Sequence, residues 1–372
     1  MTTAPAFTIG IEEEYLLVDP VTCALRTAPP ALLTDLKDAL GDQVSTEFLG
    51  CQVEVGTGVC ATVADARTDL THLRRTVARI ARAHGLAPIA ASCHPWGDWS
   101  EQDRTEKPRY DKLDTDLGAV ARRMLIGGMH VHVGIEDADT RIAVMNRLTP
   151  WLPVLLALSA SSPFWQGEDT GLASWRVSVF DSMPRTGLPP HMADWAAYAA
   201  MTDTLVDLGL IEDASKIWWD LRPSAAFPTL EARICDVSPR IDAALMLAAL
   251  VQGLARMIWR GLSQDQAIPA PLILAENRWR AQRYGTTEGL IAGNPARIVP
   301  MADIVDDMLS RIAPDLAALG SADDAQRARA VVTGGTSAAR QRQLFATARA
   351  RGASERDAFR AVVTSLIEAF AP

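Results

Sequence analysis

The first stretch with a clear pattern of apolar and polar positions is residues 8–19, TIGIEEEYLLVD. Side chains of a β-strand alternate between its two faces, so Glu12 and Glu14 share one face while Ile11 and Glu13 share the other. Two carboxylates side by side repel each other unless a cation neutralises them. The pattern therefore predicts a strand that either carries a cation site or lies at a sheet edge with solvated acids.

Three further stretches alternate in the same way and carry polar pairs on one face. They are Cys51–Val55, Gly128–Gly134 and Leu230–Asp236. The polar pairs are Gln52 with Glu54, His130 with His132, and Glu231 with Arg233. Four such strands predict one concave sheet surface lined by carboxylates and imidazoles. Carboxylate oxygens with one or two imidazoles suit magnesium or manganese better than zinc.

Helical periodicity accounts for much of the remaining chain. Thr62 begins the clearest example, because it is a typical N-cap with Asp65 three residues later, and Gly85 fits the C-terminal end. Other helices are predicted at Ala31–Leu40, Asp139–Ser159 with breaks at Pro150 and Pro153, Trp195–Leu208, Ile241–Leu262 and beyond Pro300. Short strands are predicted at Val44–Leu49, Leu86–Ser92 and Lys216–Leu221. The apolar run Ala243–Val251 is too short to span a bilayer and predicts a buried helix.

Residues 161–190 form a long segment rich in glycine and proline, with tryptophan among them. Long loops of this kind are usually functional or disordered, and the aromatic residues argue against disorder. We therefore predict a segment that covers the substrate, with Arg176 and Arg185 as candidates for substrate binding. His94 follows a predicted strand and is either a site residue or a turn histidine held by Pro95.

Residues 276–285 read as the end of a helix that carries Arg278, Arg280 and Arg283. A solvated basic face is one interpretation of this cluster. Its combination with a tryptophan and a tyrosine equally suits the binding of an anion or a nucleotide. The three arginines are therefore candidates for binding a nucleotide cofactor.

Composition narrows the class of partner. The chain has 372 residues, of which 48% are hydrophobic, and a net charge of −9. No clear linker divides it, so we expect a single domain over residues 1–372. The negative charge argues against nucleic acid or an anionic membrane as the main partner, which leaves small molecules. Assembly of several copies of the chain stays open.

Several motifs of other chemistries are missing. Thr333–Ser337 lacks the lysine of a P-loop, Gly56–Gly58 lacks the third glycine of a dinucleotide fingerprint, and no GxSxG elbow occurs. If ATP binds, a sheet surface with metals must hold it. The five cysteines form no CxxC pair, and the N-terminus lacks the pattern of a signal peptide, which together indicate the reducing cytosol.

Five motifs resemble those of the bacterial carboxylate–amine ligases known as type 2 glutamate–cysteine ligases. The motifs are Gly10–Glu14, Gly128–Gly134, Arg222–Ser224, Thr229–Arg233 and Glu276–Arg280. Together they are specific, although no single one would be. The family pattern leads us to expect Cys-Gly where Gly127-Gly128 stands, a departure that concerns packing and leaves the chemistry intact.

The resemblance implies an α+β fold: a glutamine-synthetase-like curved antiparallel β-sheet with helices packed on one face. It also implies ATP and magnesium, or manganese, as cofactors. The implied metal ligands are Glu12, Glu14, Glu54, His130 and Glu231. Arg233 would contact the transferred phosphoryl group, and Arg222 is the second catalytic candidate. His132 stands where more remote ligases have Asn, so it is a candidate for lining the substrate site and no metal ligand.

The implied reaction is the ATP-dependent joining of a carboxylate and an amine through an acyl phosphate. Positioning and charge neutralisation do most of the work in such chemistry, which suits acids and arginines without a nucleophilic serine or cysteine. The family's substrates are glutamate and cysteine. A metal-dependent amide hydrolase could also use His130 and His132, although only His191 follows them as a further histidine. A catalytically inactive nucleotide-binding homologue is the other alternative, and the intact set of acids argues against it.

Overall fold

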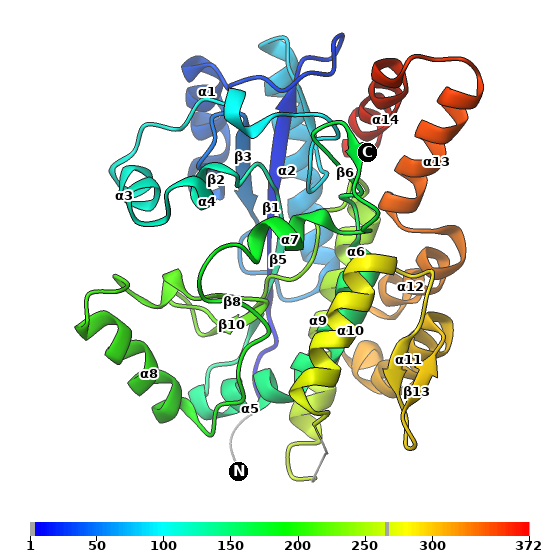
Figure 1. Ribbon diagram of the computed structural model, residues 1–372. Helices are drawn as coiled ribbons and strands as arrows, with labels where there is room; N and C mark the ends of the chain where they lie inside the picture. The colour runs from blue at the N-terminus through cyan, green and yellow to red at the C-terminus, as the bar shows by residue number, and fades with distance from the viewer. Residues whose placement is uncertain (1–3, 265–267, 372) are drawn as a thin grey trace.

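The computed structural model describes residues 4–264 and 268–371 and is built around one seven-stranded sheet (Figure 1). All pairings within this sheet are antiparallel. In spatial order, its strands are β10 (Leu221–Pro223), β11 (Thr229–Ala232), β5 (Met129–Gly134), β1 (Ile9–Val18), β3 (Gln52–Gly56) and β2 (Val44–Thr46), with β4 (Ala87–Ile89) paired to the far end of β1. The long strand β1 therefore contacts β3 along one edge and both β5 and β4 along the other.

The register between these strands decides which side chains meet. Glu12 of β1 lies opposite His130 of β5, and Glu14 lies opposite Glu54 of β3. On the other side of β5, His132 lies opposite Glu231. Directly opposed residues have neighbouring side chains on the same face. The pairing thus gathers the polar pairs of all four alternating stretches on one face.

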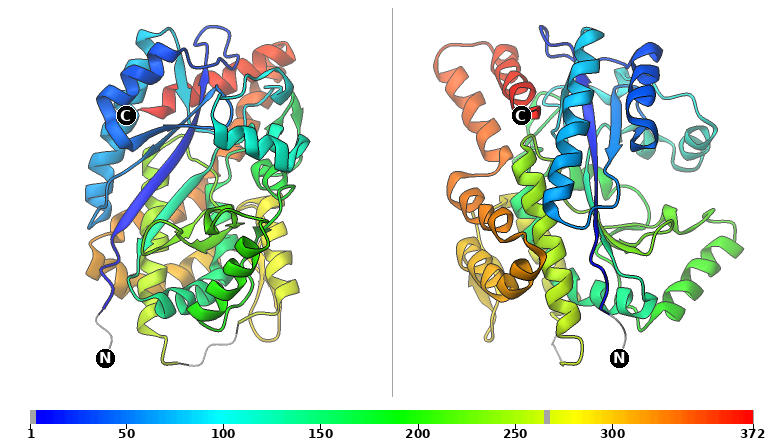
Figure 2. Two further views of the ribbon diagram at one scale, coloured as in Figure 1. Left: turned by 90° about the vertical axis from the view of Figure 1, so that its left-hand side faces the viewer. Right: turned by 180° about the vertical axis from the view of Figure 1, so that it is seen from behind.

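Helices cover the other face of the sheet (Figure 2). Helix α2 (Val63–Ala83) packs on β1 and β4, α9 (Ile241–Arg260) packs on β5, and α14 (Glu355–Phe370) packs on β4. Helix α2 begins with the predicted capping box, in which Thr62 and Asp65 each accept a hydrogen bond from the other's backbone. The predicted α+β class, with helices on one face of an antiparallel sheet, is confirmed.

Glu13 ties the back of β1 to this helical layer. It is fully buried with Arg74 of α2, whose Nε and Nη2 atoms donate to its two oxygens at 2.8 and 2.6 Å. The Tyr15 hydroxyl also donates to Glu13, at 2.5 Å. The other guanidinium N–H groups of Arg74 donate to the carbonyls of Ser238, Pro239 and Phe370. All five N–H donors of the guanidinium are therefore used.

The remaining helices extend this layer and flank the sheet. They are α1 (Pro30–Leu40), α5 (Ala138–Leu148), α6 (Leu152–Ser159), α10 (Pro271–Tyr284), α11 (Met301–Leu319), α12 (Ala322–Gly334) and α13 (Ser337–Ala350). By length and composition alone, 138–159 and 241–260 could cross a membrane, but core helices of soluble proteins pass the same test. Their apolar windows are 72% and 78% buried, so the predicted buried helix around 243–251 is confirmed.

Short elements lie over the front face of the sheet, on the side away from α2 and α9 (Figures 1 and 2). They are α3 (Pro108–Leu117), α4 (Ala119–Arg122), α7 (Trp175–Phe180), β8 (Thr186–Gly187), α8 (Trp195–Asp207) and β9 (Trp218–Trp219). The hairpin of β6 (Phe164–Trp165) and β7 (Glu168–Asp169) packs instead against α13 and α14, where Phe164 contacts Phe345 and Phe359. A separate hairpin is formed by β12 (Leu290–Ala292) and β13 (Arg297–Val299). The predicted continuous strand over 216–221 was wrong. Lys216 ends a 3-10 turn (Ala214–Lys216), β9 covers only Trp218–Trp219, and β10 begins at Leu221. Arg222 Nη1 donates to the carbonyls of Ser215 and Ile217, which holds this segment in a curl.

Candidate functional site

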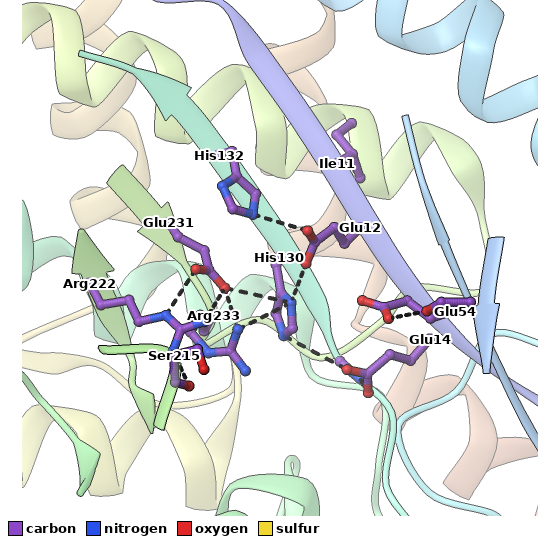
Figure 3. Close-up of polar contacts among 12 residues, drawn as sticks. Ile11, Glu12, Glu14, Glu54, His130, His132, Ser215, Arg222, Glu231 and Arg233 are labelled. Carbon is purple, nitrogen blue, oxygen red and sulfur yellow. Dashed lines mark hydrogen bonds and ion pairs between the residues drawn. The ribbon is translucent and has the colours of Figure 1, made fainter. Parts of the chain in front are cut away.

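A cavity of about 550 Å³ lies on the front face of the sheet. Its floor carries the polar side chains of the sheet (Figure 3). These are Glu12, Glu14, Glu54, His130, His132, Arg222, Glu231 and Arg233. The segments over the front face supply the walls, including Tyr110, Arg176, Phe180, Lys216, Trp218 and Phe227. Stretches far apart in sequence therefore meet around one space large enough for small-molecule substrates.

Glu12 stands between the two imidazoles of β5. Its Oε2 atom is 2.9 Å from His130 Nδ1, and its Oε1 atom is 3.3 Å from His132 Nε2. Burial acts to raise the pKa of Glu12, but the two histidines outweigh it and lower the pKa well below the ordinary value. Burial also opposes protonation of His132, yet Glu12 and Glu231 together raise its pKa. Glu12 is thus held ionised in the cavity floor.

Glu14 and Glu54 form a second acidic pair, one pleat further along β1. The backbone N–H of Gly128 donates to Glu14 at 2.8 Å, and the Ser45 hydroxyl donates to Glu54 at 2.7 Å. Burial raises the pKa of Glu14 above its ordinary value, and the negative charge of Glu54 adds to this rise. His130 Nε2 lies 4.0 Å from Glu14. Two neighbouring acids thus lie close to one imidazole, and a backbone N–H bonds to one of them.

Glu231 is gripped by two arginines. Arg222 Nε donates to it at 2.9 Å, and Arg233 Nη1 makes a short contact with its other oxygen. Although burial acts in the opposite direction, the two guanidiniums hold the pKa of Glu231 well below its usual range. Arg233 Nε is buried and has no hydrogen-bond partner among the described residues. Because buried donors are almost always paired, this atom indicates a missing acceptor in the cavity.

The ligating atoms fall into two groups that could each hold a divalent cation. One is Glu12, His130 and Glu231, and the other is Glu14, Glu54 and His130; in each group the atoms lie within 4.8 Å of one another. Carboxylate-rich sets with one imidazole match the preferences of magnesium and manganese. The donor set therefore fits such an ion, and the predicted metal ligands Glu12, Glu14, Glu54, His130 and Glu231 all belong to it.

The arginines predicted to bind a nucleotide lie outside the lining of this cavity. Arg278 forms ion pairs with Asp181 and Asp220 at 2.7 and 2.6 Å. The side chain of Arg280 donates to the carbonyl of Gly289, and that of Arg283 donates to the carbonyl of Gly171. The guanidiniums of all three are engaged in bonds within the chain. Nucleotide binding by these three residues stays a prediction.

Of the two arginines predicted to bind substrate in the segment 161–190, only one lines the cavity. Arg176 lines the cavity, whereas Arg185 donates to the carbonyl of Lys216 and stacks on Trp218 with its guanidinium 5.3 Å from the ring centroid. Arg185 is therefore a wall support and is absent from the lining. His94 is buried away from the cavity, and its ring nitrogens contact the carbonyl of Cys23 and the N–H of Trp96.

Two polar residues that support the site, Ser45 and Thr229, were not among the predicted site residues. Ser45 holds Glu54, and Thr229 holds His132 through a 2.9 Å contact between its hydroxyl and Nδ1. Thr229 lies two residues before Glu231, so strand alternation could have placed it on the same face. The position of Ser45 depends on its pairing with Glu54 across the β2–β3 hairpin, which only the register reveals.

Comparison with known proteins connects this chain to one family. The profile of glutamate–cysteine ligase family 2 matches residues 8–364. A protein from Jannaschia sp. (strain CCS1) named "Putative glutamate--cysteine ligase 2" is 54% identical over 366 residues, which cover 98% of this chain and 97% of that protein. A protein of the same name from Paracoccus denitrificans (strain Pd 1222) is 53% identical over 372 residues, covering 100% and 99%.

Solved structures share the fold at much lower sequence identity. The glutamate–cysteine ligase of Francisella tularensis, solved in complex with AMP, aligns with a TM-score of 0.71 and 14% identity over 98% of this chain and 88% of that one. The bifunctional glutathione synthetase of Pasteurella multocida gives a TM-score of 0.71 and 15% identity over 98% of this chain. The chain spans about half of that protein, namely 53%.

Proposed function

The chain belongs to glutamate–cysteine ligase family 2, and from this premise we propose that it is an ATP-dependent carboxylate–amine ligase. The proposed product is an amide of the γ-glutamyl type, with ADP and phosphate released. The proposed substrates are glutamate as the carboxylate and cysteine as the amine, as the names of the relatives suggest. We further propose that residues 1–372 act as one catalytic domain. Location in the cytosol stays a prediction.

One observation supports this proposal: four strands of one sheet place five side chains that could hold a metal in the floor of one cavity. Arg233 lies beside them, and its Nε has no hydrogen-bond partner within the described ranges of the chain. The histidines of the lining contact Glu12, Arg233 and Thr229, and among the described residues neither bonds to Ser215 or Ser224 of the same lining. Acyl transfer by a nucleophilic side chain therefore has no support here. Acids that can hold divalent cations, together with arginines that contact phosphate oxygens, are the arrangement that phosphoryl transfer requires.

The residues of the floor divide the work. A magnesium or manganese ion, when bound, would neutralise phosphate charge and act as a Lewis acid on phosphoryl oxygens. Glu12, Glu14, Glu54, His130 and Glu231 would hold such ions. Arg233 would donate its free Nε–H to the phosphoryl group in transfer, and Arg222 would keep Glu231 ionised and in place. The wall segments would exclude water from the acyl phosphate, which water would otherwise hydrolyse.

Hydroxylamine offers a direct experiment, because it captures acyl phosphates as hydroxamates. The wild-type protein with ATP, magnesium, glutamate and hydroxylamine is expected to form hydroxamate and an equal amount of ADP. Arg233→Lys keeps the charge but loses the planar guanidinium, so its rate should fall by about 10²–10³-fold while ATP affinity holds.

Three results would count against the proposal. Hydroxamate formed without ATP would indicate an acyl-transferring hydrolase. Nucleotide binding without ADP release across all twenty amino acids would indicate an inactive homologue. A fully active Arg233→Lys protein would remove Arg233 from the mechanism.

A further inference from the structure

The ladder between β11 and β5 contains one extra residue, and Arg233 lies within it. Ala232 pairs with Val131, but the next bridge joins Asp236 to Gly128. Three residues (233–235) therefore face two (129–130), which is a β-bulge. Such a bulge bends its strand and re-aims a side chain, and bulges are frequent next to active sites.

The bulge leaves two carbonyls without hydrogen-bond donors in the sheet, and the guanidinium of Arg176 donates to both. Its Nη2 atom donates to the carbonyl of Arg233 at 3.1 Å, and its Nη1 atom donates to the carbonyl of Ile234 at 3.3 Å. The Arg176 side chain is 3% exposed, so few water molecules could replace it. Buried carbonyls without donors cost free energy. Without Arg176, residues 233 and 234 would therefore be more stable in a shifted backbone position where other donors reach these carbonyls.

Gly128 makes room for the guanidinium. A Cβ atom at this position would lie 2.4 Å from Arg176 Nη2, 2.9 Å from its Cζ and 3.0 Å from its Nε. The first two distances are shorter than real Cβ atoms show, and the third is at the tight limit, so the guanidinium rests directly on the backbone just before β5. Gly128 has no positive φ angle, and space is the reason it must be glycine here.

A buried polar cluster fixes the backbone from which Arg176 extends. The Arg176 N–H donates to the Ser162 hydroxyl, which donates in turn to Asp236 at 2.8 Å. Ser174 and the N–H of Ser161 also donate to Asp236, each at 2.8 Å. Asp236 is the residue that closes the bulge, so the same cluster anchors both the bulge and Arg176.

We propose that Arg176 is a positioning residue that clamps the β-bulge and thereby holds Arg233 in the cavity beside Glu231. This inference rests on the proposed function, in which Arg233 contacts the transferred phosphoryl group, and it replaces the substrate-binding role predicted for Arg176. Both hydrogen bonds made by its guanidinium go to the backbone, and a side chain at Gly128 would collide with this guanidinium.

The experiment combines kinetics with hydrogen–deuterium exchange. Arg176→Lys keeps the charge but cannot span two carbonyls, so kcat should fall by about 10²-fold, the cost of a small misplacement of a catalytic group, with KM values nearly unchanged. Gly128→Ala pushes the guanidinium away without changing any charge and should give the same loss. If both act through the clamp, the double variant should lose no more than either single variant.

A matched control lies on the same strand. Gly134→Ala places a Cβ 2.4 Å from Thr8 Oγ1, at the other end of β5 from the bulge, and should leave kcat within about twofold. Exchange at the amides of residues 233–236 should rise in Arg176→Lys and Gly128→Ala and stay unchanged in Gly134→Ala.

The two readouts separate this inference from the proposed function. If the wild-type protein forms no hydroxamate, the proposed function fails, and the exchange data alone decide the clamp. A raised KM with unchanged kcat and unchanged exchange in Arg176→Lys would overturn the clamp and assign Arg176 to substrate binding. Additive losses in the double variant would also overturn it.

Discussion

The two faces of strand β1 carry the same side chain in opposite circumstances. On the back, Glu13 meets a guanidinium whose five N–H groups are all engaged, and the pair is closed to solvent. On the front, Glu12 and Glu14 meet imidazoles and a further acid, and their cavity contains an arginine Nε with no hydrogen-bond partner in the part of the chain that the structure describes. The charge of Glu13 is fully paired within the described part of the chain, while the charges of Glu12 and Glu14 are not. The difference teaches that, on this strand, the structural acid differs from the two site acids both in its burial and in having a fully paired opposite charge.

The largest loss of stability is expected when the buried ion pair on the back of β1 is broken. Glu13→Gln removes the charge that balances the buried Arg74 guanidinium, and breaking a buried ion pair in this way costs about 3–5 kcal/mol. Urea unfolding at pH 7 should show this loss as a lower midpoint with an unchanged slope. Asp42→Asn, which removes an ion pair between exposed side chains of Lys37 and Asp42, is the control and should change nothing measurable. An equally small effect of Glu13→Gln would erase the contrast between the two faces.

The next effect concerns pH. Burial lowers the pKa of His94 from 6.5 to about 4. The unfolded chain therefore binds a proton below pH 6.5 that the folded protein refuses until about pH 4, so stability is full above 6.5 and is lost as pH falls through this window. The loss amounts to roughly 3 kcal/mol.

His94→Gln tests this assignment because glutamine keeps a donor and an acceptor but does not titrate. Its stability between pH 4 and 6.5 should fall less steeply than that of the wild-type protein. The slope that persists then belongs to other groups, including His132, whose raised pKa acts with the opposite sign. An identical slope in both proteins would remove His94 as the source.

The smallest effect distinguishes the two front-face acids. Glu14→Gln removes a charge that burial and Glu54 disfavour, so the metal-free protein should keep or slightly gain stability. Glu12→Gln removes a charge that His130 and His132 favour, and it should bring no such gain. Thermal unfolding in EDTA compares them. A large loss in Glu14→Gln would mean that Glu14 is structural in the way that Glu13 is.

Local patterns in the sequence were enough to predict which face each of these acids occupies. Strand alternation separates Glu13 from Glu12 and Glu14, and the capping signal at Thr62 located the start of α2. The antiparallel sheet and its one-sided helical layer came from the resemblance to a family. These features depend on neighbours in the chain or on whole motifs, and both are visible in a sequence.

Long-range pairing accounts for what the sequence could not predict. The ion-pair partners of Arg278, Asp181 and Asp220, lie 97 and 58 residues away, so no local pattern in the sequence indicated these pairs. Nucleotide binding by Arg278 stays a prediction. The curl before Arg222 follows from bonds that this side chain makes once the sheet has formed. The bulge at Arg233 is set by the register against β5 and has no local signal. None of these three features can be predicted without knowing which segments of the chain meet in space.

The central claim is that the front face of β1 forms a divalent-cation site that works with ATP. Electron paramagnetic resonance of Mn²⁺, titrated into the protein with saturating ATP and counted against ATP-only samples, tests it most directly. The wild-type protein and Asp42→Asn should bind Mn²⁺ in a protein-dependent manner, whereas Glu12→Gln should bind it about 10–100-fold more weakly. Wild-type binding no stronger than that of ATP alone, or equal binding by Glu12→Gln, would contradict the claim.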